Sequence, residues 1–113
     1  MNSPIAVFTI RDGQPHVSGE CDMSNADELE RWLEAFGRVP LRVNMSGVTF
    51  FDSSALRAML HAVRRNSQLR ITAPSARVAR VLIMTETYRE LMSGGDAVSA
   101  PVFWSDGASL FAS

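Results

Sequence analysis

Residues 43–57 hold an apolar run that passes through Asp52-Ser53-Ser54 directly into an amphipathic stretch. Its first part, rich in Val, Met and Phe, is typical of a buried strand. Its second part spaces apolar residues three and four apart, which is typical of a helix. A strand that leads straight into a helix is half of a strand–helix–strand unit, so this feature favours an α/β fold.

The rest of the chain alternates in the same way. We expect an N-terminal hairpin from residue 5 to residue 18, with its turn at Asp12-Gly13. Ser24 and Asp27 resemble a capping box that opens a helix, and Gly37 is a plausible stop for it. That helix would bury an apolar stripe formed by Leu29, Trp32, Leu33 and Phe36.

The remaining elements follow from the same patterns. A strand is expected from residue 41, with Val48 and Phe50 carrying its apolar run up to Asp52, and then a helix over about residues 54–65. A short strand at 69–72 and a helix opened by residues 73–75 come next. Residues 88–92 either extend that helix or form a separate turn. Residues 101–104 are predicted to form an edge strand, and 107–112 a terminal helical turn.

Together these elements predict one α/β domain over residues 1–113. Its mixed sheet of four to five strands, with an N-terminal hairpin, would be covered by three to four helices. Sites in such sheets gather at the carboxyl ends of the strands. Asp22 follows the second strand, while Asp52 and Ser53 follow the third. If those strands are parallel neighbours, the three residues share one edge of the domain.

Composition narrows the possible partners and compartments. The formal net charge is −1, so no global charge favours nucleic acid or an anionic membrane. No apolar run approaches the ~20 residues of a membrane span, and no signal peptide is recognisable. Cys21 is the single cysteine, which excludes an intrachain disulfide and points to the cytoplasm.

Enzyme chemistry is not expected. His61 lies eight residues after Ser53, about 12 Å along a helix, and no G-x-S-x-G motif surrounds the serine. One cysteine and two histidines give no metal-site spacing, and no phosphate-binding glycine loop occurs. We therefore predict no catalytic residue, no cofactor, no metal and no direct nucleic-acid binding.

Ser53 instead fits a switch. At the N-cap or first position of a helix its hydroxyl would be open to another protein's active site. A phosphate there adds about −1.5 to −2 charges, which the start of a helix tolerates and a docked partner does not. Asp22 and Asp52 would add to the negative potential. The simpler interpretation is that Ser53 is an ordinary N-cap, worth ~1 kcal/mol to the helix.

Several segments together resemble the STAS domain family (sulfate transporter and anti-sigma factor antagonist). They cover nearly the whole chain: Gly19-Glu20-Cys21-Asp22, Ser24-Asn25-Ala26, Met45-Ser46-Gly47-Val48, Asp52-Ser53-Ser54 and Ser75-Ala76-Arg77-Val78. The sequence is similar above all to the anti-sigma factor antagonist branch. There, an unphosphorylated antagonist binds a GHKL-type anti-sigma factor and frees a sigma factor. The anti-sigma factor is also the kinase of the serine, and a PP2C-type phosphatase reverses the modification.

The resemblance also implies roles by position. Ser53 would be the phosphoacceptor, with Ser54 as the alternative, and Asp22 an acidic contact to the partner. Ser54 would more readily satisfy N–H groups of the first helical turn. The implied partner-binding set is Asp22, Asp52, Ser53, Ser54 and Arg57. The implied setting is bacterial and cytoplasmic, without a membrane.

The sequence departs from the family pattern at two positions, and the roles of Arg57 and of the whole domain each have an alternative. Ala55 stands where many relatives have Gly, and Asn44 where a strand Asp is common. Arg57 is either solvated or contacts a phosphate or an acidic partner. The outward stripe of Arg57, His61, Arg64 and Arg65 is expected to be solvated. The alternative function is a STAS domain that meets no kinase, as an interaction subunit of an ABC-type lipid transport or sensory complex.

Overall fold

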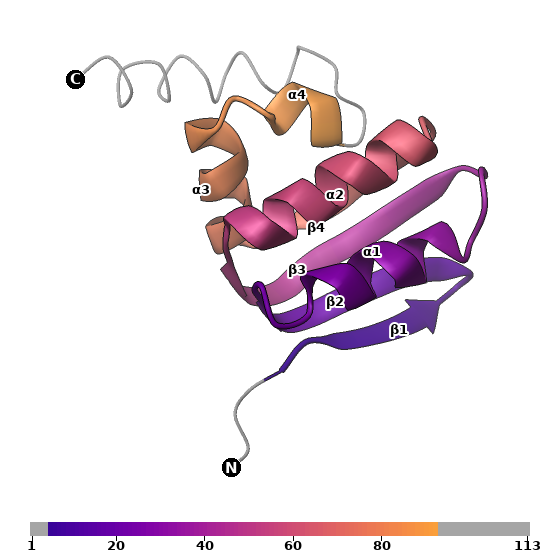
Figure 1. Cartoon of the computed structure of the whole chain (residues 1–113), viewed down its shortest axis with the longest axis horizontal. Helices are drawn as coiled ribbons and strands as arrows, with labels where there is room; N and C mark the ends of the chain where they lie inside the picture. Colours follow the sequence, from indigo (N-terminus) through magenta and orange to yellow (C-terminus); the bar gives the residue numbers. More distant parts are fainter. Residues whose placement is uncertain (1–4, 93–113) are drawn as a thin grey trace.

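The computed structural model describes residues 5–92. After an initial pair of strands, helices and strands alternate, and the described chain ends with two consecutive helices; Figure 1 shows their arrangement. In chain order they are β1 (Val7–Arg11), β2 (Gln14–Cys21), α1 (Ala26–Glu34), β3 (Leu41–Phe51), α2 (Ser53–Arg65), β4 (Leu69–Pro74), α3 (Ala76–Met84) and α4 (Tyr88–Leu91). The strand at 101–104 and the turn at 107–112 predicted from sequence lie outside the described residues.

The sheet is mixed, as predicted. Its order is β1-β2-β3-β4, with β1 antiparallel to β2 and the other two pairs parallel. Asp12 and Gly13 join β1 to β2 with φ angles of 53° and 78°. Two positive φ values in a two-residue loop are the signature of a type I′ turn, whose twist matches that of a hairpin. The predicted α/β class and the N-terminal hairpin are therefore confirmed.

Helices α1 and α2 lie side by side on one face of the sheet (Figure 1). Both belong to crossovers that step the same way across the sheet, and right-handed crossovers of that kind place their helices on one face. The core lies between these helices and the sheet. Leu29 and Leu33 of α1, Met59 of α2, and Val43 and Ile71 of the sheet are almost completely buried there.

The beginning of α1 differs from the prediction. Asn25 is its N-cap, and the expected capping box of Ser24 and Asp27 does not form. The backbone N and the hydroxyl of Ser24 instead donate to the carboxylate of Asp22. Asn25 is held in turn by Glu20, whose carbonyl accepts from the Asn25 amide at 2.9 Å. Ser24 is therefore hydrogen-bonded within a local turn and does not cap the helix.

Irregular pairing near the end of β3 changes which side chain faces inward. The register between β2 and β3 shifts between Gly19 and Glu20. Phe51 is consequently buried, while Phe50, which the apolar pattern placed in the core run, is 36% exposed. The guanidinium of Arg77 lies over the Phe50 ring, 5.5 Å from its centroid.

The sequence pattern left open whether residues 88–92 extend the preceding helix or form a separate turn. Thr85 and Glu86 interrupt the helical run, and Glu86 has a φ of 61°. Residues 88–91 consequently form α4, a helix separate from α3. Across residues 5–92, no helix has the length and apolar character that membrane crossing requires.

Candidate functional site

The parallel pairing of β2 and β3 brings the two acidic loop residues together. Cys21 and Phe51 are partners in the ladder, and the Asp52 N–H donates to the Cys21 carbonyl at 3.3 Å. Asp22 and Asp52 each follow one of these paired residues. The shared edge predicted for Asp22 and Ser53 therefore exists, because α2 begins at Ser53.

Asp52 is the N-cap of α2. Its carboxylate accepts the Ala55 N–H at 3.0 Å, which satisfies one of the donors that the first turn leaves without a helical partner. Ser53 is therefore the first helical residue, and its interpretation as an ordinary N-cap is wrong. The capping role expected of Ser54 is likewise performed by Asp52.

The two serines differ in access. Ser53 is exposed, and its hydroxyl makes no hydrogen bond within residues 5–92. Ser54 is half-buried and lines a pocket between α1 and α2. A modifying enzyme that needs an open hydroxyl would meet Ser53 first. Phosphorylation of Ser53 stays a prediction.

The loop before α1 is held by its own polar groups. The Asp22 carboxylate accepts the Ser24 N–H at 2.9 Å and the Ser24 hydroxyl at 2.5 Å. These two bonds lower the pKa of Asp22, because they favour its ionised form. The Asn25 side chain accepts from the Asp22 N–H at 3.1 Å. Asp22 thus organises the loop, in addition to the partner contact predicted for it.

Met23, at the tip of this loop, was missed by the sequence analysis. It is 81% exposed and lines the same pocket as Ser54. The sequence signal that could have identified it is an apolar residue between Asp22 and Ser24, in a segment expected to be a loop.

The pocket beside the serines has a volume of about 150 Å³. It lies between the first turns of α1 and those of α2, and the exposed Arg57 is at its border. Its lining is mixed in charge: Met23, Ala26, Asp27, Glu30, Ser54, Arg57, Ala58 and His61.

The outward stripe of α2 is exposed, as expected, at Arg57, Arg64 and Arg65, and half-buried at His61. Nδ1 of His61 lies 3.3 Å from Oε1 of Glu30, and Nε of Arg65 lies 2.8 Å from Oε2 of Glu34. These contacts join α2 to α1 and leave Arg65 exposed, so the expectation of a solvated stripe falls short only at the half-buried His61. Arg57 and Arg64 are exposed and form no ion pair among residues 5–92.

Cys21 lies under the site and is fully buried. Burial, together with the charges of Asp22 and Asp52, raises the pKa of its thiol from the ordinary 9.0 to about 12. The thiolate is the form that attacks and that binds metals, so a buried thiol with a raised pKa is poorly suited to either role. Cys21 therefore acts as a small apolar core residue.

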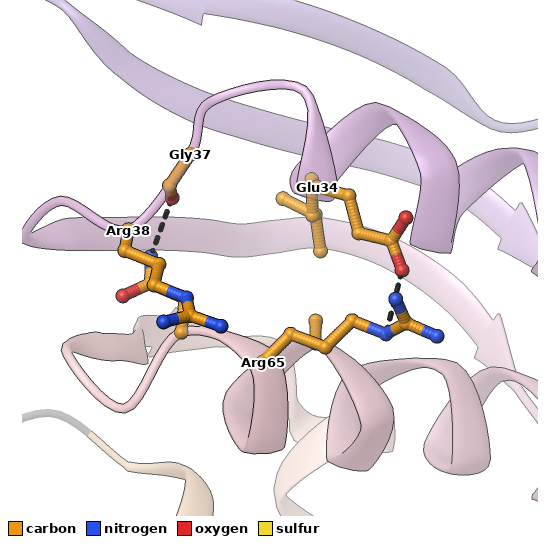
Figure 2. A pocket seen from close by; sticks show the side chains of 7 residues that line it. Glu34, Gly37, Arg38 and Arg65 are labelled. Carbon is orange, nitrogen blue, oxygen red and sulfur yellow. Dashed lines mark hydrogen bonds and ion pairs between the residues drawn. The ribbon is translucent and has the colours of Figure 1, made fainter.

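A second pocket, of about 300 Å³, lies at the other ends of α1 and α2. Figure 2 shows Arg38 and Arg65 around it, with Arg65 bonded to Glu34. The buried Asn66 closes it by donating to the carbonyls of Gly37 and Val39 at 3.2 and 2.8 Å. Twelve residues of α2, about 18 Å, separate Ser53 from Arg65. This pocket is not part of the site at Ser53.

Comparisons with known proteins agree with this architecture. The family model for the Mlab STAS domain matches residues 9–91. The fold is similar to the crystal structure of an anti-sigma factor antagonist from Mycobacterium paratuberculosis, with a TM-score of 0.63 and 24% sequence identity. That likeness covers 79% of this chain and 83% of the other. No curated protein matches the sequence.

Proposed function

Because the chain belongs to the STAS domain family, we propose that it is an interaction module that acts as an anti-sigma factor antagonist. Its unphosphorylated form binds an anti-sigma factor of the GHKL type and frees a sigma factor. Phosphorylation of Ser53 by that same anti-sigma factor switches binding off, and a PP2C-type phosphatase restores it. The chain itself catalyses nothing, binds no nucleic acid directly and works in the bacterial cytoplasm.

The observation that carries this proposal is the exposed hydroxyl of Ser53, which makes no hydrogen bond within residues 5–92 and lies at the sheet edge that also holds Asp22 and Asp52. Since that hydroxyl holds no part of the fold together, a phosphate on it would leave the domain folded. The first turn of α2 contains no acidic residue that would repel the phosphate from within the helix. A partner surface docked over Asp22, Asp52 and Ser53 would meet about two further negative charges.

Affinity measurements test the switch. Ser53→Asp should weaken binding to the cognate anti-sigma factor by at least ~2 kcal/mol, about 30-fold, because it buries a like charge at the interface. Ser53→Ala should bind like the wild type. Isothermal titration calorimetry with the purified anti-sigma factor measures both. Equal affinities for the two variants would contradict the switch.

Mapping the phosphate tests the acceptor. We expect incubation with ATP and the anti-sigma factor to place one phosphate on Ser53, detectable by mass spectrometry of the digested chain. Ser54→Ala should still be modified, whereas Ser53→Ala should not. Phosphate on Ser54 alone would move the acceptor by one residue, and a chain left unmodified by every candidate kinase would rule the switch out.

A second candidate function has its own support. The family model that matches residues 9–91 is that of the Mlab STAS domain. An interaction subunit of an ABC-type lipid transport or sensory complex would use the same surface without a kinase. Genes for a permease and an ATPase beside this one would favour the transport subunit. Genes for a GHKL-type kinase and a sigma factor would favour the antagonist.

A further inference from the structure

We propose that Arg57 pairs with the phosphate on Ser53 inside the same helix, so that modification removes a free cation from the docking surface as well as a hydroxyl. This inference rests on the proposed function, because it concerns the phosphorylated form of the same site. It assigns to Arg57 a regulatory contact within the chain.

The spacing of the two residues places them together. Ser53 and Arg57 stand at positions i and i+4 of α2, where side chains share a face with Cβ atoms about 5–6 Å apart. Both residues are exposed, so no packing has to be broken for them to meet. An acid four residues before a base is the favourable order for a helical ion pair. A guanidinium also suits the phosphate geometry, since it donates two parallel hydrogen bonds.

Arg57 is also the cation of α2 that is both available and within reach. His61 and Arg65 are engaged by Glu30 and Glu34 of α1. Arg64 makes no ion pair among the described residues, but it lies eleven residues after Ser53, about 16 Å along the helix. A phosphate on Ser53 therefore has one cation of its own helix close to it.

The charges around Ser53 make this pairing consequential. Asp52 precedes the serine and Asp22 lies across the strand ends, while Asp27 and Glu30 line the pocket that Arg57 borders. His61, the other basic group of that pocket, is held by Glu30. The acids repel a phosphate, and Arg57 offsets them. Phosphorylation would then change the local charge of the Ser53–Arg57 pair from +1 to about −1.

Phosphorus NMR tests the pair without any kinase. Phosphoserine is installed at position 53 during translation by amber suppression, and the second pKa of the phosphate is read from a titration of its ³¹P shift. Arg57→Gln should raise that pKa by about 0.5, as expected for one charge-assisted helical pair. Arg57→Lys should retain most of the effect, and ~1 M salt should shrink it. Arg64→Gln is the matched control and should leave the pKa unchanged.

Two results would overturn the inference. One is the same second pKa in the phosphorylated wild type and in Arg57→Gln. The other is an equal rise in Arg64→Gln, which would indicate the general field of the protein and not a local pair. Failure of the proposed function is distinguishable from both. A Ser53 that no kinase modifies would remove the switch, while the titration would still report whether Arg57 pairs with a phosphate placed there.

Discussion

At the scale of single residues, Asp52 sets the geometry of the Ser53 site. Asp52→Ala should lower the free energy of unfolding by ~1 kcal/mol, because the Ala55 N–H loses its capping acceptor. Asp52→Asn keeps an acceptor oxygen and should stay within about 0.5 kcal/mol of the wild type. Urea denaturation followed by circular dichroism measures both. If Asp52→Ala unfolded at the same urea concentration as the wild type, the cap would contribute nothing to stability.

Capping is also where sequence reasoning fell short. The sequence correctly predicted an open serine at the start of a helix, but it gave the capping role to a serine. Asp, Ser and Asn are about equally good N-caps, so Asp52-Ser53-Ser54 contains three candidates. The choice is made by tertiary structure: Asp52 is bonded through its N–H to Cys21 on the neighbouring strand, which fixes where β3 ends.

At the scale of elements, Gly19 allows β2 to bend beside the chain that enters β1. Its φ is 89°, and a Cβ at this position would overlap the carbonyl oxygen of Ile5. Gly19→Ala should therefore destabilise the fold by about 2–3 kcal/mol, through backbone strain plus the overlap.

Gly37 provides the matched control for that substitution. Its φ is 81°, but a Cβ there would meet no atom within 4 Å. Gly37→Ala should therefore lose only the strain term, about 1 kcal/mol. Thermal unfolding of the two variants under one set of conditions compares them. Equal losses would mean that the approach of Ile5 to Gly19 has no energetic weight.

Irregularities within elements explain the other errors of the sequence analysis. Strict alternation onward from the buried Val48 would bury Phe50 and expose Phe51. The register shift opposite Gly19 and Glu20 instead buries Phe51 and leaves Phe50 at the surface. Such shifts depend on the partner strand, which a periodicity along one segment does not contain. Regular segments, such as the Leu29 and Leu33 stripe of α1, were predicted correctly.

At the scale of the whole molecule, the parallel sheet makes the site. Residues 22 and 53 are distant in sequence, and the β2–β3 pairing joins them at one edge. This edge was predictable, because it follows from the order of strands and helices alone. The side-chain contacts between α1 and α2 were not predictable, since Glu30 meets His61 only after both helices pack on the same face. That packing leaves Ser53 and Arg57 exposed, and neither side chain has a hydrogen-bond or ion-pair partner among residues 5–92.

The packing of helices on the sheet also buries Cys21 completely. The free energy of unfolding should therefore depend on pH in the alkaline range. In the folded chain the thiol pKa is raised from 9.0 to about 12, by burial first and then by Asp22 and Asp52. Between these values the unfolded chain loses the thiol proton while the folded chain keeps it. The folded state then binds more protons, so the free energy of unfolding should fall as pH rises through this window.

Cys21→Ala isolates the contribution of the thiol. The variant should be less stable than the wild type near pH 8, because it leaves a small void in the core. Its stability should then decline less steeply above pH 9, since no thiol is left to ionise. Urea unfolding of both chains at pH 8, 9 and 10 gives both slopes. Equal slopes would mean that the Cys21 thiol ionises as readily in the folded chain as in the unfolded one, which its complete burial should prevent.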